Sequence, residues 1–143
     1  MREILFRGKR FDNGKWVEGL LWKKKYDTPK LFMSYFPNKD DDEYVVVIDP
    51  ETVGQYTGLK DTNGKKIFEG DILGDWGEDE KGKECLCYMG VVDYWEREGK
   101  YVLTDKNGYC NDWTFEEEGK PENWEKLIIL GNIHDNPELL QEE

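Results

Sequence analysis

The sequence predicts a mainly β protein with little helix, and three observations support this fold class. None of the 143 residues is alanine, which has the highest helix propensity. The chain contains 6 Trp, 8 Tyr, 6 Phe and 15 Gly, and aromatic side chains favour strands. Segments rich in aromatic and β-branched residues recur, separated by Gly, Asn, Asp or Pro, as is typical of strands joined by turns.

The expected strands follow one another from residue 4 to residue 132. They begin or lie within Ile4–Phe6, Trp16–Trp22, Leu31–Tyr35, Tyr44–Ile48, Thr52–Thr57, Asp71–Trp76, Cys85–Glu96, Lys100–Thr104 and Lys126–Asn132. Acidic loops are expected at Asn38–Glu43, Glu78–Glu84 and Glu116–Glu125. Gly90 favours a bend in its long strand, of the kind that small closed barrels require.

Only the tail is expected to be helical. Asn136 can cap a short helix, and Pro137 suits the first helical position.

Period two along Trp16–Trp22 places Trp16, Leu20 and Trp22 on one face, with Glu18 among them. Residues 1–143 are expected to form a single domain, because the length is close to the usual prior for one domain.

Charge is distributed unevenly along the chain. The 20 basic and 32 acidic residues give a net charge of −12, yet residues 1–37 hold nine Lys/Arg and four Asp/Glu, a net of +5. This basic segment could bind nucleic acid. The favoured interpretation is a solvated strand face that pairs with the acidic remainder, because a strongly negative protein repels phosphate at long range.

Aromatic and basic residues alternate near the start of the chain and form the candidate contact surface. Its members are Trp16, Trp22, Lys23, Lys24 and Lys25. The two tryptophans could stack bases, although core positions are the favoured interpretation. The lysine run could equally protect an edge strand from unwanted pairing.

The composition argues against several classes of protein. No apolar run approaches the roughly 18 residues of a membrane helix, and the charged start lacks a signal-peptide core. Three Cys are too few for a disulfide scaffold. We therefore expect a protein of the bacterial cytoplasm, with no membrane partner.

Cofactor and metal sites are not expected. Cys85 and Cys87 share a strand face and could join Cys110 and His134 around zinc, but structural zinc pairs usually lie on turns. Reduced thiols that pack as small hydrophobes are the favoured interpretation. The segment 105–116 resembles a calcium loop, yet its fifth and sixth positions do not fit.

Catalysis is not expected either. A Ser-His-Asp triad would need Ser34 beside His134, the only Ser and the only His in the chain. The sequence has no phosphate-binding glycine loop with the required lysine. With 32 acidic residues, a pair of carboxylates suitable for acid–base chemistry carries no information.

The stretch Gln55–Ile72 carries the densest pattern of turn residues. Asp61-Thr62-Asn63-Gly64 predicts a tight turn in which Gly64 supplies a positive φ. Lys65–Phe68 is expected to be a short return strand, followed by a second turn at Glu69-Gly70-Asp71. The Asp71 carboxylate is expected to accept nearby backbone N–H groups and to fix that corner. We call this stretch the signature; its characteristic residues are Gln55, Tyr56, Thr57, Gly58, Leu59, Asp61, Asn63, Gly64, Glu69, Gly70 and Asp71.

The signature resembles the YopX-like family of phage and prophage proteins. The resemblance extends to both termini, through Met1-Arg2-Glu3-Ile4, Phe6-Arg7, Gly131-Asn132-Ile133-His134 and Asn136-Pro137-Glu138-Leu139-Leu140. It implies a small SH3-like β-barrel core with additional strands, and a tendency to self-associate. It implies no established activity and carries over no catalytic residue.

The leading hypothesis is a non-enzymatic phage or prophage protein that acts by self-assembly or by binding another host or phage protein. Exposed aromatics would anchor such an interface. One alternative is nucleic-acid binding through the basic N-terminal third, which is not favoured. Another is an acidic nucleic-acid mimic that binds a host DNA-binding protein.

Overall fold

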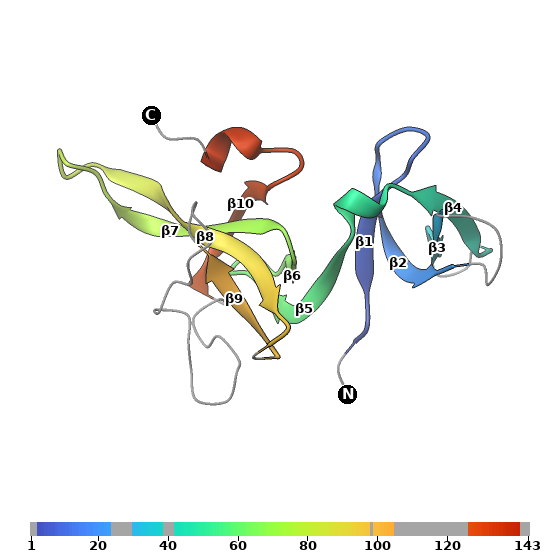
Figure 1. The fold of residues 1–143 in the computed structure, drawn as a ribbon. Coiled ribbons are helices and arrows are strands. Elements are labelled where there is room, and N and C mark those ends of the chain that lie inside the picture. The colour runs from blue at the N-terminus through green and yellow to red at the C-terminus, as the bar shows by residue number, and fades with distance from the viewer. Residues whose placement is uncertain (1–2, 24–29, 39–41, 98, 105–125, 141–143) are drawn as a thin grey trace. The chain divides into compact units, whose positions relative to one another are not determined.

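The computed structural model describes residues 3–23, 30–38, 42–97, 99–104 and 126–140. In these ranges the chain forms strands joined by turns and two short 3₁₀ helices (Figure 1). The strands are β1 (Phe6–Lys9), β2 (Trp16–Trp22), β3 (Leu31–Tyr35), β4 (Tyr44–Ile48), β5 (Gly54–Lys60), β6 (Lys66–Phe68), β7 (Asp71–Glu78), β8 (Glu84–Trp95), β9 (Lys100–Thr104) and β10 (Ile128–Asn132), and the helices are η1 (Pro50–Thr52) and η4 (Pro137–Leu140). The prediction of a mainly β protein is confirmed.

Strands β2, β3, β4 and β9 have the predicted bounds, whereas β1 and β5 lie further along the chain than expected. Thr52 was expected in a strand and instead ends helix η1. Pro50 opens that helix with its fixed φ, and the Asp49 side chain accepts a hydrogen bond from the Glu51 N–H at 3.1 Å. A capping residue followed by proline therefore outweighs the β propensity of threonine here.

The strands form two antiparallel sheets, and neither closes into a barrel. The six-stranded sheet has the order β4-β3-β2-β1-β5-β6, and the four-stranded sheet has the order β10-β7-β8-β9. A single bridge joins Arg10 to Ile48, between the end of β4 and the chain after β1. One bridge is too short to make a ladder, so the predicted SH3-like barrel is not confirmed.

The chain divides into two compact units, Met1–Tyr56 and Thr57–Glu143, and strand β5 passes from one into the other. The sequence predicts a single domain over residues 1–143. That expectation stays a prediction.

Close backbone packing shapes the core of the first unit. Met33 and Ile48 are its fully buried hydrophobic side chains, and both lie on the face of the sheet that also holds Gly8 and Gly19. A Cβ on Gly19 would stand 2.0 Å from the carbonyl oxygen of Ser34. Glycine at this position therefore lets β2 and β3 approach each other.

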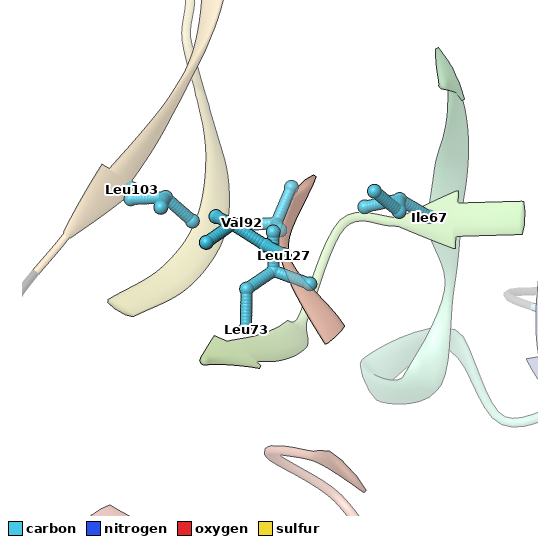
Figure 2. Close-up of a cluster of buried hydrophobic side chains, with 5 residues drawn as sticks. All are labelled: Ile67, Leu73, Val92, Leu103 and Leu127. Carbon is cyan, nitrogen blue, oxygen red and sulfur yellow. The ribbon is translucent and has the colours of Figure 1, made fainter. Parts of the chain in front are cut away.

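The second unit has a core of five buried aliphatic side chains, contributed by β6, β7, β8, β9 and the residue directly before β10 (Figure 2). These are Ile67, Leu73, Val92, Leu103 and Leu127. Half-buried Leu59, Tyr101 and Ile129 pack against them. Isoleucine, leucine and valine on alternate positions of neighbouring strands thus produce one contiguous cluster.

The long strand β8 has an irregularity at Gly90, the glycine at which the sequence predicts a bend. Leu73 of β7 pairs with Gly90 and the next residue, Gly74, pairs with Tyr88, so the ladder shifts register there. A Cβ on Gly90 would lie 2.9 Å from the Leu103 Cβ. The glycine accommodates both the bulge and the neighbouring strand β9.

The predicted terminal helix is a single 3₁₀ turn, η4. The carbonyl of Asn136, rather than its side chain, accepts from the Leu139 N–H at 3.1 Å. The Asn136 Oδ1 instead accepts from the Asn132 N–H at 3.2 Å, above Gly131, where a Cβ would clash with it. Within the described residues, no helix is long and apolar enough to cross a membrane.

Gly19→Ala should lower the free energy of unfolding by at least about 2 kcal/mol, because the new methyl group meets backbone that cannot rotate away. Gly14→Ala is the matched control. Gly14 has φ of 71° but open space around its Cβ position, so only backbone strain of about 1 kcal/mol applies. Urea denaturation of both variants tests this, and equal losses would contradict the close approach of β2 and β3.

Candidate functional site

Strand register places an aromatic and basic set of side chains on one face of the first sheet. Residues directly opposite in antiparallel strands share a face, and side chains two apart along a strand do so too. We define the aromatic face by this rule; it consists of Arg7, Lys9, Trp16, Glu18, Leu20, Trp22, Phe32, Ser34, Val45 and Val47. The predicted grouping of Trp16, Leu20 and Trp22, with Glu18 among them, is thus present.

Trp22 is held in one orientation although it is partly exposed to solvent. Its ring stacks on Phe32 with a centroid distance of 4.6 Å and an interplanar angle of 16°. Its Nε1 donates a hydrogen bond to the Ser34 Oγ at 3.0 Å. Because the side chain is 37% exposed, it lies at the surface and is a pre-oriented aromatic anchor rather than a core residue.

Trp16 is half-buried beneath two cations. The Arg7 Cζ lies 4.8 Å from the centroid of the Trp16 ring, and the Lys9 Nζ lies 5.3 Å from it. Both distances are within the range of cation–π attraction. The ring is therefore engaged with cations of its own sheet.

Of the predicted lysine run, only Lys23 belongs to the described residues, and it is exposed directly after β2. Lys24 and Lys25 lie outside the described residues. The structure thus brings Trp16, Trp22 and Lys23 to one sheet. It also adds residues that the sequence did not single out, chiefly Phe32, Ser34, Arg7 and Lys9.

The signature forms turns and anchors strands of the second unit. The buried Asp61 carboxylate accepts hydrogen bonds at Oδ1 from the N–H groups of Asn63 and Lys65, both at 2.9 Å. Its Oδ2 accepts from the Ile129 N–H at 3.1 Å. One carboxylate therefore fixes both the β5–β6 turn and strand β10.

The second signature turn is held by another buried carboxylate, as predicted. The Asp71 Oδ2 accepts from the Phe68 N–H at 2.8 Å. Gly70 between them has φ of 89°, a conformation that favours glycine. Thr57 also anchors this region, because its Oγ1 donates to the Ile67 carbonyl at 2.8 Å.

The Asp61 turn occurs a second time in the chain, at the tip of the β7–β8 hairpin. The Asp79 Oδ1 accepts from the N–H groups of Lys81 and Lys83, at 2.9 Å and 2.8 Å. Gly64 and Gly82 occupy the same place in the two turns, with φ of 80° and 76°. Asp79 is exposed and lacks the third bond that Asp61 makes to β10.

The residues weighed for metal binding belong only in part to the described ranges. No group of three or more His, Cys, Asp or Glu side chains with metal-binding geometry occurs among the described residues. Cys85 is half-buried and reduced, and Cys110 lies outside the described residues, as does the whole of the segment 105–116. The Ser34 Oγ accepts the Trp22 hydrogen bond.

Fold and surface together define a mainly β protein of two units that presents a pre-oriented aromatic face. The family model described as "YopX protein" matches residues 5–141. The chain therefore belongs to the YopX family, which confirms the resemblance of the signature and the termini.

The fold also occurs in a solved crystal structure, that of protein EF1440 from Enterococcus faecalis. The two chains are 21% identical, the match covers 99% of this chain and 100% of the other, and the TM-score is 0.55. At this identity the similarity shows the fold alone. No curated protein matches the sequence.

Asp61→Asn should lower the free energy of unfolding by about 1–3 kcal/mol. An amide has only one acceptor oxygen, so its NH2 group would face a buried backbone N–H that has lost its acceptor. Asp79→Asn is the matched control. The amide oxygen there can keep both turn bonds, so the loss should stay below about 1 kcal/mol. Denaturant unfolding of the two variants measures the difference, and a loss as small for Asp61 as for Asp79 would remove its role in holding β10.

Tyr56 gives the signature a pH dependence at the alkaline end. Burial raises the pKa of its hydroxyl above the usual value of about 10, and the charge of Glu3 adds to the rise. The unfolded chain therefore ionises first, so this group's contribution to stability is present below pH 10 and is lost as the pH rises further. Relative to the wild type, Tyr56→Phe should gain stability between pH 9 and pH 11 in denaturant titrations, and a constant difference would contradict this.

Proposed function

We propose that the protein is a non-enzymatic interaction module of phage or prophage origin that acts by associating with a second copy of itself in the cytoplasm of a bacterial host. The single observation that supports this most strongly is the aromatic face of the first sheet. It carries a fixed indole and exposed aliphatic side chains on an otherwise highly charged protein.

The aromatic face is contiguous across three strands. Leu20, Ser34 and Val45 are directly opposite one another on β2, β3 and β4, and Leu20 and Val45 are 55% and 49% exposed. The next row contains Trp22, Phe32 and Val47. Neighbours within a row lie about 4.8 Å apart, and the two rows are two residues, or roughly 7 Å, apart along the strands, so together they form one largely apolar patch. Patches of this kind on soluble proteins mark interaction sites.

The rigidity of Trp22 supports an interface rather than incidental exposure. A side chain already held by stacking on Phe32 and by a hydrogen bond to Ser34 loses little rotamer entropy on binding. Tryptophan is also enriched among the residues that dominate interface energetics. The anchor therefore has the properties expected of an interface residue.

A binding role also agrees better with the chemistry of the described residues than catalysis does. The hydroxyl of the only serine is engaged by Trp22, and two of the signature carboxylates, those of Asp61 and Asp71, are occupied by backbone N–H groups. Nucleophilic or acid–base catalysis needs a group positioned to reach a substrate. These groups instead hold the fold.

Nucleic-acid binding through the same surface has less support. Base stacking needs an accessible ring face, whereas Trp16 lies beneath Arg7 and Lys9 and one face of the Trp22 ring is covered by Phe32. Binding of this kind would weaken steeply as salt is raised. An apolar interface between copies is much less sensitive to salt, so a salt titration of the complex separates the two.

Leu20→Glu should shift the protein from oligomer to monomer, because it places a charge in the centre of the apolar patch. Phe11→Glu is the control: it adds the same charge at a more exposed aromatic outside the aromatic face, and should leave association unchanged. Light scattering after gel filtration, over a concentration series at moderate salt, gives the mass relative to the 16.9 kDa chain. A wild-type protein that stays monomeric throughout would overturn the proposed function.

A further inference from the structure

The β7–β8 hairpin extends beyond the other strands of its sheet as a two-stranded arm (Figure 1). Among the described residues, β10 pairs with β7 only as far as Gly74, and β9 pairs with β8 only from Val91 onward. From Asp75 to Glu78, β8 is therefore the one described strand that pairs with β7. We call residues 75–87 the arm. A two-stranded ribbon is marginally stable in water on its own, so contact with another surface would stabilise it.

One face of the arm combines an aromatic side chain with paired carboxylates. Trp76 and Glu78 are two residues apart on β7, and Glu84 of β8 is directly opposite Glu78. Trp76 is 56% exposed, and both glutamates are exposed as well. Like charges directly opposite each other are unfavourable, and neither carboxylate has an ion-pair partner among the described residues. This arm face would gain from contact with cations.

The aromatic face of the first unit offers the complementary chemistry. Arg7 and Lys9 lie over the ring of Trp16 on this face, and exposed Lys23 follows Trp22 in the chain. Leu20 and Trp22 supply exposed apolar surface on the same face. A tryptophan with two glutamates on one side of it therefore matches an apolar patch with two cations, Arg7 and Lys9, and the single carboxylate of Glu18 on one side of it.

The net charge of the chain is also divided unequally between the two units, with the negative charge on the unit that carries the arm. Residues 1–56 contain 10 basic and 10 acidic side chains, so the remaining 10 basic and 22 acidic ones, and the whole net charge of −12, fall in the second unit. Within the first unit, residues 1–37 carry a net charge of +5. Second units repel one another, whereas a second unit and the basic segment of another copy attract.

We infer that the arm of one copy docks on the aromatic face of another, with Trp76 on the patch around Leu20 and Trp22, and with Glu78 and Glu84 beside Arg7 and Lys9. This inference deepens the proposed function and rests on it, because it names the surface that covers the aromatic face. The two surfaces differ, so the contact is heterologous, and each copy can give one arm and accept another.

A mixing experiment tests the heterologous contact. Trp76→Ala removes the anchor of the arm and leaves the aromatic face intact, whereas Leu20→Glu damages the face and leaves the arm intact. Each variant alone should associate at least about 30-fold more weakly than the wild type, as for loss of an interface hot spot. Mixed in equal amounts, they should form a dimer and nothing larger. The intact arm of the Leu20→Glu variant can dock on the intact aromatic face of the Trp76→Ala variant, and no second pair of intact surfaces remains.

The control for the arm is Phe11→Ala, which removes an exposed aromatic of similar size outside both surfaces and should associate like the wild type. A charge exchange adds a second test. Glu78→Lys should weaken association, and Lys9→Glu, placed in the partner copy, should restore part of it. Thermal unfolding of each variant verifies that it is folded before its mass is measured by light scattering.

The outcomes separate this inference from the proposed function. If the wild type associates but the mixture of Trp76→Ala and Leu20→Glu stays monomeric, the arm is not the occupant, while self-association stands. If the wild type is monomeric at every concentration, both are overturned. If nuclease treatment abolishes association, nucleic acid bridges the copies and the direct contact is wrong.

Discussion

The second unit depends on the carboxylate of Asp61, which accepts hydrogen bonds from backbone donors of its own turn and from Ile129, 68 residues further along the chain. A charge that is 5% exposed is tolerated only when it is well hydrogen-bonded, and this one accepts three N–H groups. The next residue, Thr62, donates its N–H to the carbonyl of Leu127 at 2.9 Å. Leu127 is fully buried in the core, so the turn also seats the chain that leads into β10. The hydrogen bonds of this turn therefore also hold a residue of the hydrophobic core in place.

Much of the fold could be predicted from the sequence because its signals are local. Alternation over Trp16–Trp22 and apolar runs such as Tyr44–Ile48 gave strand bounds that match, and the turn at Asp61 was readable from its Asp and Gly. Barrel closure was not predictable, because it depends on whether the outer strands of a sheet meet. Among the described residues, a single bridge, Arg10–Ile48, joins the outer strand β4 to the chain after β1, which is an inner strand of the sheet. The division into two units likewise arises from long-range contacts that leave no mark on any single segment.

The candidate site was predictable only in part, for a related reason. Period two placed Trp16 and Trp22 on one face, but their partners come from neighbouring strands whose register no sequence pattern fixes. Phe32 and Ser34 orient Trp22 only because β3 pairs with β2 in that register. Alternation along Phe6–Lys9 could have suggested that Arg7 and Lys9 share a face. The residues that identify the family hold turns together, whereas the aromatic face lies largely outside that stretch, so the family and the proposed interaction surface are recognised from different residues.

The length of the arm determines which way its side chains face, because the arm is a two-stranded ribbon closed by a turn that Asp79 holds by its own hydrogen bonds. Each residue advances a strand by about 3.3 Å and reverses the direction of the side chain. Insertion of one residue into each strand between Gly74 and Trp76 would turn the tryptophan and its two glutamates to the opposite face. Insertion of two would keep their face and carry them roughly 7 Å further out. A change of hairpin length in steps of two residues would thus alter the reach of the proposed contact and leave its chemistry the same.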